Sequence, residues 1–214
     1  MAEVEWWDHE DIGAMAHELA GDLAFILDQA ITANGRAWVA LPVSPRLAQP
    51  LAVLAGETLP WSKVILVPTD DDEKGTRAAA LRALFGGLGC DVQPLRGIDR
   101  LAAPPDMVWL APGPDGQVAG LAPGPGLVAA LSTPRPVVDL AGGQGLSGSA
   151  IRSARAIVVT LFGDEQRQAV ERAIADGAGS RQPIGRLLAE CEQAIDIHCL
   201  EDGDASDDED DDLD

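Results

Sequence analysis

The chain has 214 residues, 46% of them hydrophobic, which suffices for one globular domain with a sizeable core. Its 35 acidic residues against 15 Lys and Arg give a formal net charge of −20. This charge disfavours binding to nucleic acid and to an anionic membrane surface. No apolar run approaches the roughly 18 residues of a membrane-spanning helix, and the N-terminus MAEVEWWDHED is acidic where a secretion signal would be basic. We therefore expect a cytoplasmic protein.

Much of the negative charge lies at the C-terminus. Residues 201–214 read EDGDASDDEDDDLD, with ten acids and no basic residue. Such a segment has too little apolar surface to offset the entropy that ordering would cost. We predict a folded domain over residues 1–200, followed by a disordered acidic tail over residues 201–214.

The cysteines and histidines form no recognisable site. The cysteines are Cys90, Cys191 and Cys199, without a C-x-x-C pair, which predicts free thiols in a reducing compartment. The histidines are His9, His17 and His198, and none has a second ligand at a zinc spacing. We expect no metal, and a structural role is favoured for His198 because it lies on a predicted strand.

The first predicted element is a long amphipathic helix over residues 8–33. Its apolar residues recur at three- and four-residue spacing, which is typical of a helix with one buried face. These residues are Ile12, Met15, Ala16, Leu19, Leu23, Ile26, Leu27 and Ile31. Asn34 and Gly35 supply a stop signal.

Short apolar runs bounded by glycine, proline and polar residues then predict strands. These runs cover residues 36–42, 63–68, 90–95, 107–111, 136–141, 156–162 and 194–199. Helices are predicted at residues 47–56, 73–89, 124–132 and 164–176 and after Pro183. Continuous apolar strands that alternate with helices indicate an α/β domain with a mostly parallel sheet and helices on both faces.

In such sheets ligands bind at the carboxyl ends of the strands. We therefore expect a site among the loops after Leu41, Pro68, Leu110, Leu140 and Phe162.

A glycine string, GQGLSG from Gly143 to Gly148, follows one of these runs, with Asp164 about twenty residues beyond its first glycine. The spacing is that of a dinucleotide-binding loop. However, the helix that could follow is shorter than the usual crossover. Nucleotide binding therefore stands as an alternative to a simple glycine-rich turn.

Several stretches occur in the order of the landmarks of one family. They are EVEWWD, ALPVSPR, WSKVILVPTDD, VWLAPGPDGQVAG, and IVVTLFGDEQRQAVERAIADGAGSRQPIGRLL followed by IDIHC. From Val4 to Cys199 the chain thereby resembles the 6-phosphogluconolactonases, which are related to glucosamine-6-phosphate isomerases. The resemblance implies a Rossmann-like, doubly wound fold and hydrolysis of the lactone of 6-phosphogluconate in the pentose phosphate and Entner-Doudoroff routes. It implies no metal or organic cofactor.

The motifs that this family uses to bind its substrate are altered here. A Gly-Gly-x-Thr-Pro turn is replaced by residues 43–47, VSPRL, which leaves Ser44 and Arg46 as candidate contacts. The family's Asp-Glu-Arg or Asp-Asp-Arg, whose arginine binds phosphate, reads Asp70-Asp71-Asp72. An anion in place of that cation reverses the sign of the interaction with phosphate.

The catalytic motif is altered as well. The family's Asp-Gly-His, whose histidine is the expected general base, reads Asp115-Gly116-Gln117, and glutamine cannot take a proton near neutral pH. Two further motifs of the family are altered. A phosphate-binding lysine is replaced by Gln166 with Arg167 beside it, and the Ser-Asn expected at a helix start reads Thr76-Arg77.

These substitutions lead to three hypotheses. The first is a 6-phosphogluconolactonase-like protein of carbohydrate metabolism that is weak or inactive as a lactonase and acts as a binding or regulatory homologue with a protein partner. In the second, the chain hydrolyses 6-phosphogluconolactone or another sugar lactone, with Asp115 orienting water and Arg46 or Arg77 as relocated anion contacts. The third is the nucleotide-binding module. The resemblance also predicts that Asp70, Asp71, Asp72 and Asp115 meet in an acidic cleft that repels sugar phosphates.

Overall fold

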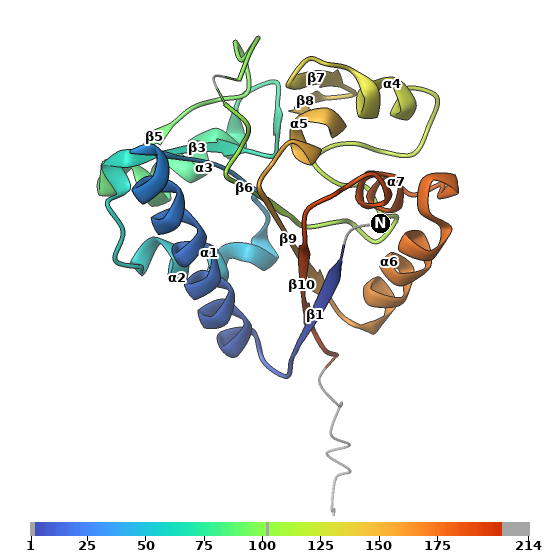
Figure 1. Cartoon of the computed structure of the whole chain (residues 1–214), viewed down its shortest axis with the longest axis horizontal. Helices are drawn as coiled ribbons and strands as arrows, with labels where there is room; N and C mark the ends of the chain where they lie inside the picture. The colour runs from blue at the N-terminus through green and yellow to red at the C-terminus, as the bar shows by residue number, and fades with distance from the viewer. Residues whose placement is uncertain (1–2, 102, 203–214) are drawn as a thin grey trace, which may run out of the picture.

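The computed structural model describes residues 3–101 and 103–202. Its main sheet has seven strands in the order β1-β10-β9-β6-β2-β3-β5, and all neighbours are parallel (Figure 1). The strands are β1 (Val4–His9), β2 (Ala37–Leu41), β3 (Val64–Pro68), β5 (Asp91–Val92), β6 (Met107–Leu110), β9 (Ala156–Phe162) and β10 (Ile195–Leu200). The predicted α/β fold with a mostly parallel sheet is confirmed. The predicted tail, apart from Glu201 and Asp202, lies outside the described residues.

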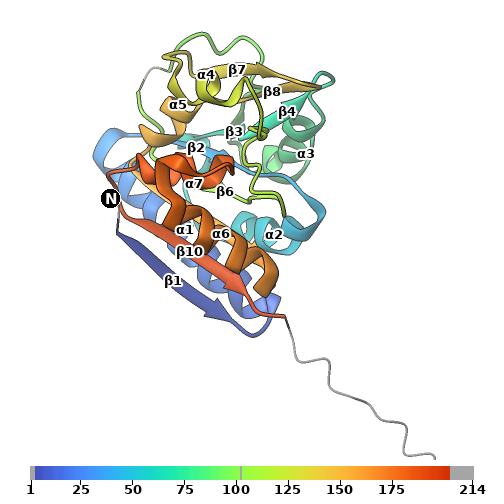
Figure 2. The same cartoon turned by 90° about the vertical axis from the view of Figure 1, so that its right-hand side faces the viewer.

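Helices cover both faces of this sheet, and Figure 2 shows α6 and α7 in front of it with α1 behind. The helices are α1 (Ile12–Asn34), α2 (Ala48–Gly56), α3 (Thr76–Phe85), α4 (Leu127–Ser132), α5 (Gly148–Arg152), α6 (Asp164–Asp176) and α7 (Pro183–Ala189). One apolar cluster joins the sheet to α1, α2 and α3, and a second joins it to α4, α5, α6 and α7. Successive strand residues alternate between the clusters, as Val39 and Ala40 do, because side chains of a strand point to opposite faces. No helix in the described part of the chain is long and apolar enough to cross a membrane.

The N-terminal segment differs from the prediction. Helix α1 begins at Ile12 rather than at residue 8. Its N-cap is Asp11, whose side chain accepts a hydrogen bond from the Ala14 N–H at 2.8 Å. The preceding residues form the edge strand β1, which pairs in parallel with β10. Sequence reasoning missed β1 because acidic and exposed residues interrupt its apolar pattern.

A second, three-stranded antiparallel sheet lies at one end of the molecule with α4 and α5 (Figure 2). It consists of β4 (Asp70–Asp72), β8 (Gly143–Leu146) and β7 (Val137–Leu140), with β8 in the middle. The prediction that residues 136–141 belong to the parallel sheet is therefore wrong. Strand β7 is only half-buried, and its apolar run did not distinguish the two environments.

The glycine string does not form a phosphate-binding loop, because its first four residues are strand β8. A Cβ atom on Gly143 would lie 2.0 Å from the carbonyl oxygen of Asp71, and one on Gly145 would lie 2.2 Å from that of Ala119. The glycines thus allow neighbouring backbone segments to approach closely. The helix that follows, α5, has only five residues. The nucleotide-binding interpretation is therefore wrong.

Candidate functional site

A cleft of about 590 Å³ opens at the carboxyl ends of the parallel strands. It is lined by residues that follow β2, β3, β6, β9 and β10. Strands β3 and β5 lie on one side of β2 in the sheet, and strands β6, β9 and β10 lie on its other side. The cleft therefore lies where the strand order reverses, the usual ligand site of such sheets. Four of the five loops predicted to form a site line it, and only the loop after Leu140, which belongs to the small sheet, does not.

Six of the ten residues singled out from the sequence line the cleft. They are Ser44, Arg46, Asp70, Arg77, Gln117 and Gln166. The other four, Asp72, Asp115, Gly116 and Arg167, are not among its lining residues.

Asp70 and Arg77 form the main charged pair of the cleft. The Arg77 Nη2 atom lies 3.4 Å from the Asp70 Oδ2 atom. Burial raises the pKa of the Asp70 carboxyl group, and Arg77 and a hydrogen bond from Thr69 oppose this rise. Arg77 therefore already has an anionic partner within the protein, which reduces its availability to an anionic ligand.

Asp71 and Asp72 do not face the cleft, because their carboxylates accept hydrogen bonds from the first turn of α3. The Asp71 oxygens accept from the backbone N–H groups of Arg77 at 2.8 Å and Ala78 at 3.2 Å. The Asp72 carboxylate accepts from the Thr76 N–H at 3.0 Å, and hydrogen bonds from Thr76 lower the pKa of Asp72. These are helix-capping roles. The predicted cluster of four aspartates in the cleft is therefore wrong.

The segment Asp115-Gly116-Gln117 forms a tight turn after β6. Gly116, with φ of +71°, donates its N–H to the Gly113 carbonyl at 2.9 Å, and the Gln117 carbonyl accepts from the Gly113 N–H at 2.8 Å. The Asp115 carboxylate is exposed and accepts from the Gln117 N–H at 3.3 Å. Gln117 is among the residues that line the cleft, whereas Asp115 is not.

Gln166 is buried at the start of α6 and has structural partners. Its Oε1 accepts from the Phe162 N–H at 2.7 Å, and its Nε2 donates to the Pro112 carbonyl. The side chain therefore ties the β9–α6 turn to the loop after β6, and its polar atoms are already engaged.

Arg167 has its partners away from the cleft. It forms ion pairs with Asp8 and Glu171, the latter at 3.0 Å, and its guanidinium carbon lies 5.1 Å from the centre of the Trp6 ring. Arg167 therefore anchors α6 to β1, and its expected contact with a ligand is not supported by this geometry.

Two acidic residues of the cleft were missed by sequence reasoning, namely Glu165 in the first turn of α6 and Asp202 after β10. The Asp202 Oδ2 atom accepts a hydrogen bond from the Asp164 N–H at 3.1 Å. Asp202 carried no signal because it belongs to the segment predicted to be disordered. Glu165 resembles any acidic residue that favours a helix N-terminus.

The ionisable side chains among the described lining residues are Arg46, Asp70, Arg77, Glu165 and Asp202. Arg46 stacks over the Phe162 ring, 5.7 Å from its centre. None of these described lining residues is a histidine, cysteine or lysine. Over residues 3–101 and 103–202, no three His, Cys, Asp or Glu side chains are arranged to hold a metal ion.

No protein-family model and no curated protein sequence matches the chain. Among solved structures, a 6-phosphogluconolactonase from Shewanella baltica OS155 superposes with a TM-score of 0.81 at 21% identity, covering 92% of this chain and 98% of that one. The enzyme from Trypanosoma brucei gives a TM-score of 0.74 at 16% identity, with 95% and 97% covered. A monomeric glucosamine-6-phosphate deaminase of the NagB superfamily gives 0.60 at 12% identity, with 92% and 97% covered. The chain therefore has the fold of these proteins, as the sequence resemblance implied.

Proposed function

We propose that this protein is a 6-phosphogluconolactonase-like protein of carbohydrate metabolism whose cleft binds a sugar-derived ligand without hydrolysing 6-phosphogluconolactone at the rate of an enzyme. The observation that carries the proposal is the Asp115-Gly116-Gln117 turn, whose Gln117 is among the residues that line the cleft. Gln117 stands where the sequence resemblance expects a general base.

The chemistry of lactone hydrolysis supports this proposal. Attack by water on the lactone carbonyl is accelerated when a side chain takes a proton from that water, and loss of such a base typically lowers the rate by about 10²- to 10⁴-fold. A glutamine amide can orient water through hydrogen bonds, but it takes no proton near neutral pH. Gln117 therefore supports binding more readily than catalysis.

The charges of the cleft also support binding of a weakly charged ligand. Arg46 and Arg77 are outnumbered by the carboxylates of Asp70, Glu165 and Asp202. A phosphate group therefore meets no net positive field. The volume of about 590 Å³ suits a small molecule, since ligand sites commonly measure about 300 to 1,000 Å³.

A lactonase assay of the full chain, corrected for spontaneous opening of 6-phosphogluconolactone, tests the proposal. We expect the rate to lie at least about 10²-fold below that of an active 6-phosphogluconolactonase under the same conditions, the lower bound for loss of a general base. Gln117→His serves as the informative variant and should restore little, because the three carboxylates still oppose a phosphate. A parent rate within about tenfold of the active enzyme contradicts the proposal.

A second candidate, a working hydrolase, is favoured by the environment of Asp70. This carboxylate lines the cleft, and burial raises its pKa, as is common for catalytic acids and bases. Asp70 therefore suits the role of general base better than the exposed Asp115. If the chain accelerates opening of any sugar lactone, Asp70→Asn should abolish the acceleration and Asp115→Asn should leave it intact. Activity should also fall as the pH drops through the raised pKa of Asp70, because only the carboxylate form takes a proton.

A further inference from the structure

A carboxylate of the protein itself occupies the N-terminus of α6 at the edge of the cleft. The Asp202 Oδ2 atom accepts a hydrogen bond from the N–H of Asp164, the first residue of this 13-residue helix. Its Oδ1 atom lies beside the preceding turn, because a Cβ atom added to Gly163 would lie 2.5 Å from it. The carboxylate thus lies directly against the start of the helix.

The main sheet fixes this position. Leu200 is paired with Phe162 at the end of β10, and its carbonyl accepts a hydrogen bond from the Gly163 N–H at 2.8 Å. The Glu201 N–H then donates to the carbonyl of His9 at 3.0 Å, so the chain remains attached to β1 one residue before Asp202. The pairing of β10 with β9 and β1 therefore places Asp202 beside the start of α6.

The start of α6 has no cap from its own sequence. Its N-cap residue is Gly163, with φ of +90°, and glycine has no side chain to accept a hydrogen bond from the first turn. Unsatisfied N–H groups and the helix dipole make such an end attractive to an anion. The first turn of α6 contains the acidic residues Asp164 and Glu165, and Asp202, 38 residues beyond Asp164, adds the carboxylate that accepts a hydrogen bond from this end. Both Gly163 and Asp202 line the cleft.

We propose that Asp202 is a specificity-determining residue, whose carboxylate fills the anion position at the α6 end of the cleft and so excludes ligands that would place an anionic group there. The proposal rests on the proposed function only in taking the cleft as the ligand site. An incoming phosphate or carboxylate must displace Asp202 from α6 or bind beside a like charge. Neutral and cationic ligand groups carry no such cost.

The test uses inorganic phosphate as the probe and the full-length chain at low ionic strength, where charge effects are least screened. Asp202→Ala vacates the position at α6. Glu201→Ala is the matched control, because it removes the same charge one residue away. The Glu201 side chain is exposed and makes no hydrogen bond to the described residues. Binding is followed by the amide NMR signals of Asp164 and Glu165 during a phosphate titration.

We expect Asp202→Ala to show saturable shifts of both amides with a Kd at least about tenfold lower than that of the parent and of Glu201→Ala. This corresponds to about 1.4 kcal/mol of binding free energy. Equal affinity in the three proteins, or no response of Asp202→Ala, overturns the proposal. The outcome is independent of the lactonase assay, because phosphate binding at α6 requires neither a sugar ligand nor catalysis.

Discussion

At the scale of single residues, the two buried histidines of the β1–β10 edge are a stacked and hydrogen-bonded pair. The His9 Nε2 atom lies 3.1 Å from the His198 Nδ1 atom, and the ring centres are 5.3 Å apart. Two carboxylates of α1 flank the pair, with Glu18 Oε2 3.7 Å from His9 Nδ1 and Asp22 Oδ2 3.9 Å from His198 Nε2. Desolvation by burial, followed by the charge of His9, lowers the pKa of His198 to about 4. This agrees with the structural role predicted for His198.

The lowered pKa of His198 predicts a loss of stability in mild acid. Above pH 6.5 this histidine is neutral in both the folded and the unfolded chain. Between pH 6.5 and about 4 it binds a proton in the unfolded chain only, so protonation favours unfolding. We expect this group to lower the free energy of unfolding by about 3 kcal/mol across that window.

Urea unfolding of the parent and of His198→Gln at several pH values measures the effect. His198→Gln should show a shallower fall in stability below pH 6.5. His17→Gln, which removes an exposed histidine of α1, should keep the slope of the parent. Parallel curves for all three proteins would show that His198 is not the group responsible.

At the scale of elements, the small sheet depends on close contact between strand β8 and its neighbours. A Cβ atom on Gly145 would lie 2.2 Å from the Ala119 carbonyl oxygen, so the backbone itself has to move. Overpacking of this kind typically costs about 1 to 3 kcal/mol, and Gly145→Ala should destabilise the protein by at least the lower value.

The control is a glycine with free space around it. Gly21 lies in α1, and a Cβ atom there meets nothing within 4 Å. Gly21→Ala should stabilise the chain by about 0.5 to 1 kcal/mol through helix propensity, opposite in sign to Gly145→Ala. Thermal unfolding compares the two, and equal effects would contradict the close-contact account of β8.

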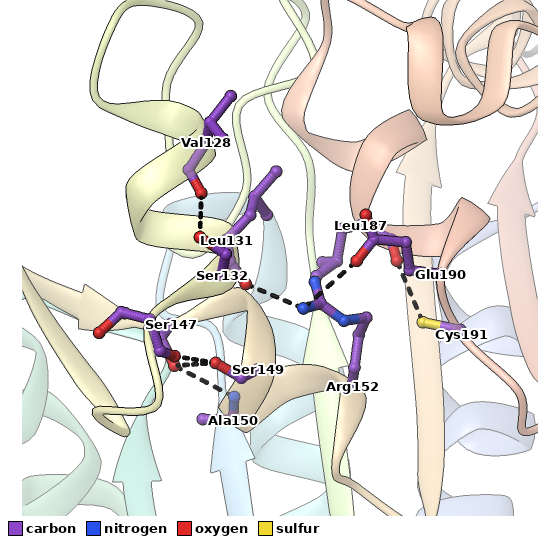
Figure 3. A network of polar contacts seen from close by, with 11 residues as sticks. Val128, Leu131, Ser132, Ser147, Ser149, Ala150, Arg152, Leu187, Glu190 and Cys191 are labelled. Atoms are coloured by element: carbon purple, nitrogen blue, oxygen red, sulfur yellow. Dashed lines mark hydrogen bonds and ion pairs between the residues drawn. The ribbon is translucent and has the colours of Figure 1, made fainter.

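A second prediction at this scale concerns Arg152 at the end of α5, which joins α4 to the end of α7 (Figure 3). Its Nη2 atom donates to the Leu131 carbonyl at 2.9 Å and lies 3.4 Å from Glu190 Oε2. The side chain is only 17% exposed, whereas that of Glu190 is 54% exposed. The hydrogen bond to Leu131 should therefore contribute more than the screened ion pair.

We expect Arg152→Met, which keeps the apolar length of the side chain, to lower the free energy of unfolding by about 2 kcal/mol, as for loss of a charged donor to a buried carbonyl. Glu190→Gln should cost less than about 1 kcal/mol, as is usual for exposed ion pairs. Chemical denaturation of both variants separates the two contacts. A larger loss of stability for Glu190→Gln than for Arg152→Met would show that the ion pair contributes more than the hydrogen bond to Leu131.

At the scale of the whole molecule, periodicity and apolar runs predicted the elements that are buried on one helix face or on both faces of the sheet. Helix α6 and strands β3 and β9 follow from such patterns, because strands covered on both faces read as continuous apolar runs. Strand β1 was missed because its pattern is mixed, and the small sheet was missed because the apolar run of β7 is the same as that of a strand in the parallel sheet.

The site was predicted in outline, because parallel strands bring their following loops together whatever the loop residues are. What each side chain binds could not be predicted in the same way. Asp72 and Arg167 carry charges that suit a ligand, but the first caps α3 and the second pairs with Asp8 and Glu171. Asp202 reached the cleft through the register of β10, which no local pattern encodes.

The position of β10 between β1 and β9 has a consequence for how the chain folds. Among the strands of residues 3–101 and 103–202, β1 pairs only with β10, and Val4 lies opposite Ile195. During synthesis from the N-terminus, β1 therefore has no partner until β10 has left the ribosome, and β9 keeps an open edge from its own synthesis until that of β10. Pairing across so long a separation closes a large loop and is slow. When β10 docks, it pairs with β1 and β9 in the same step. The rate at which β10 docks therefore sets the rate at which the parallel sheet is completed.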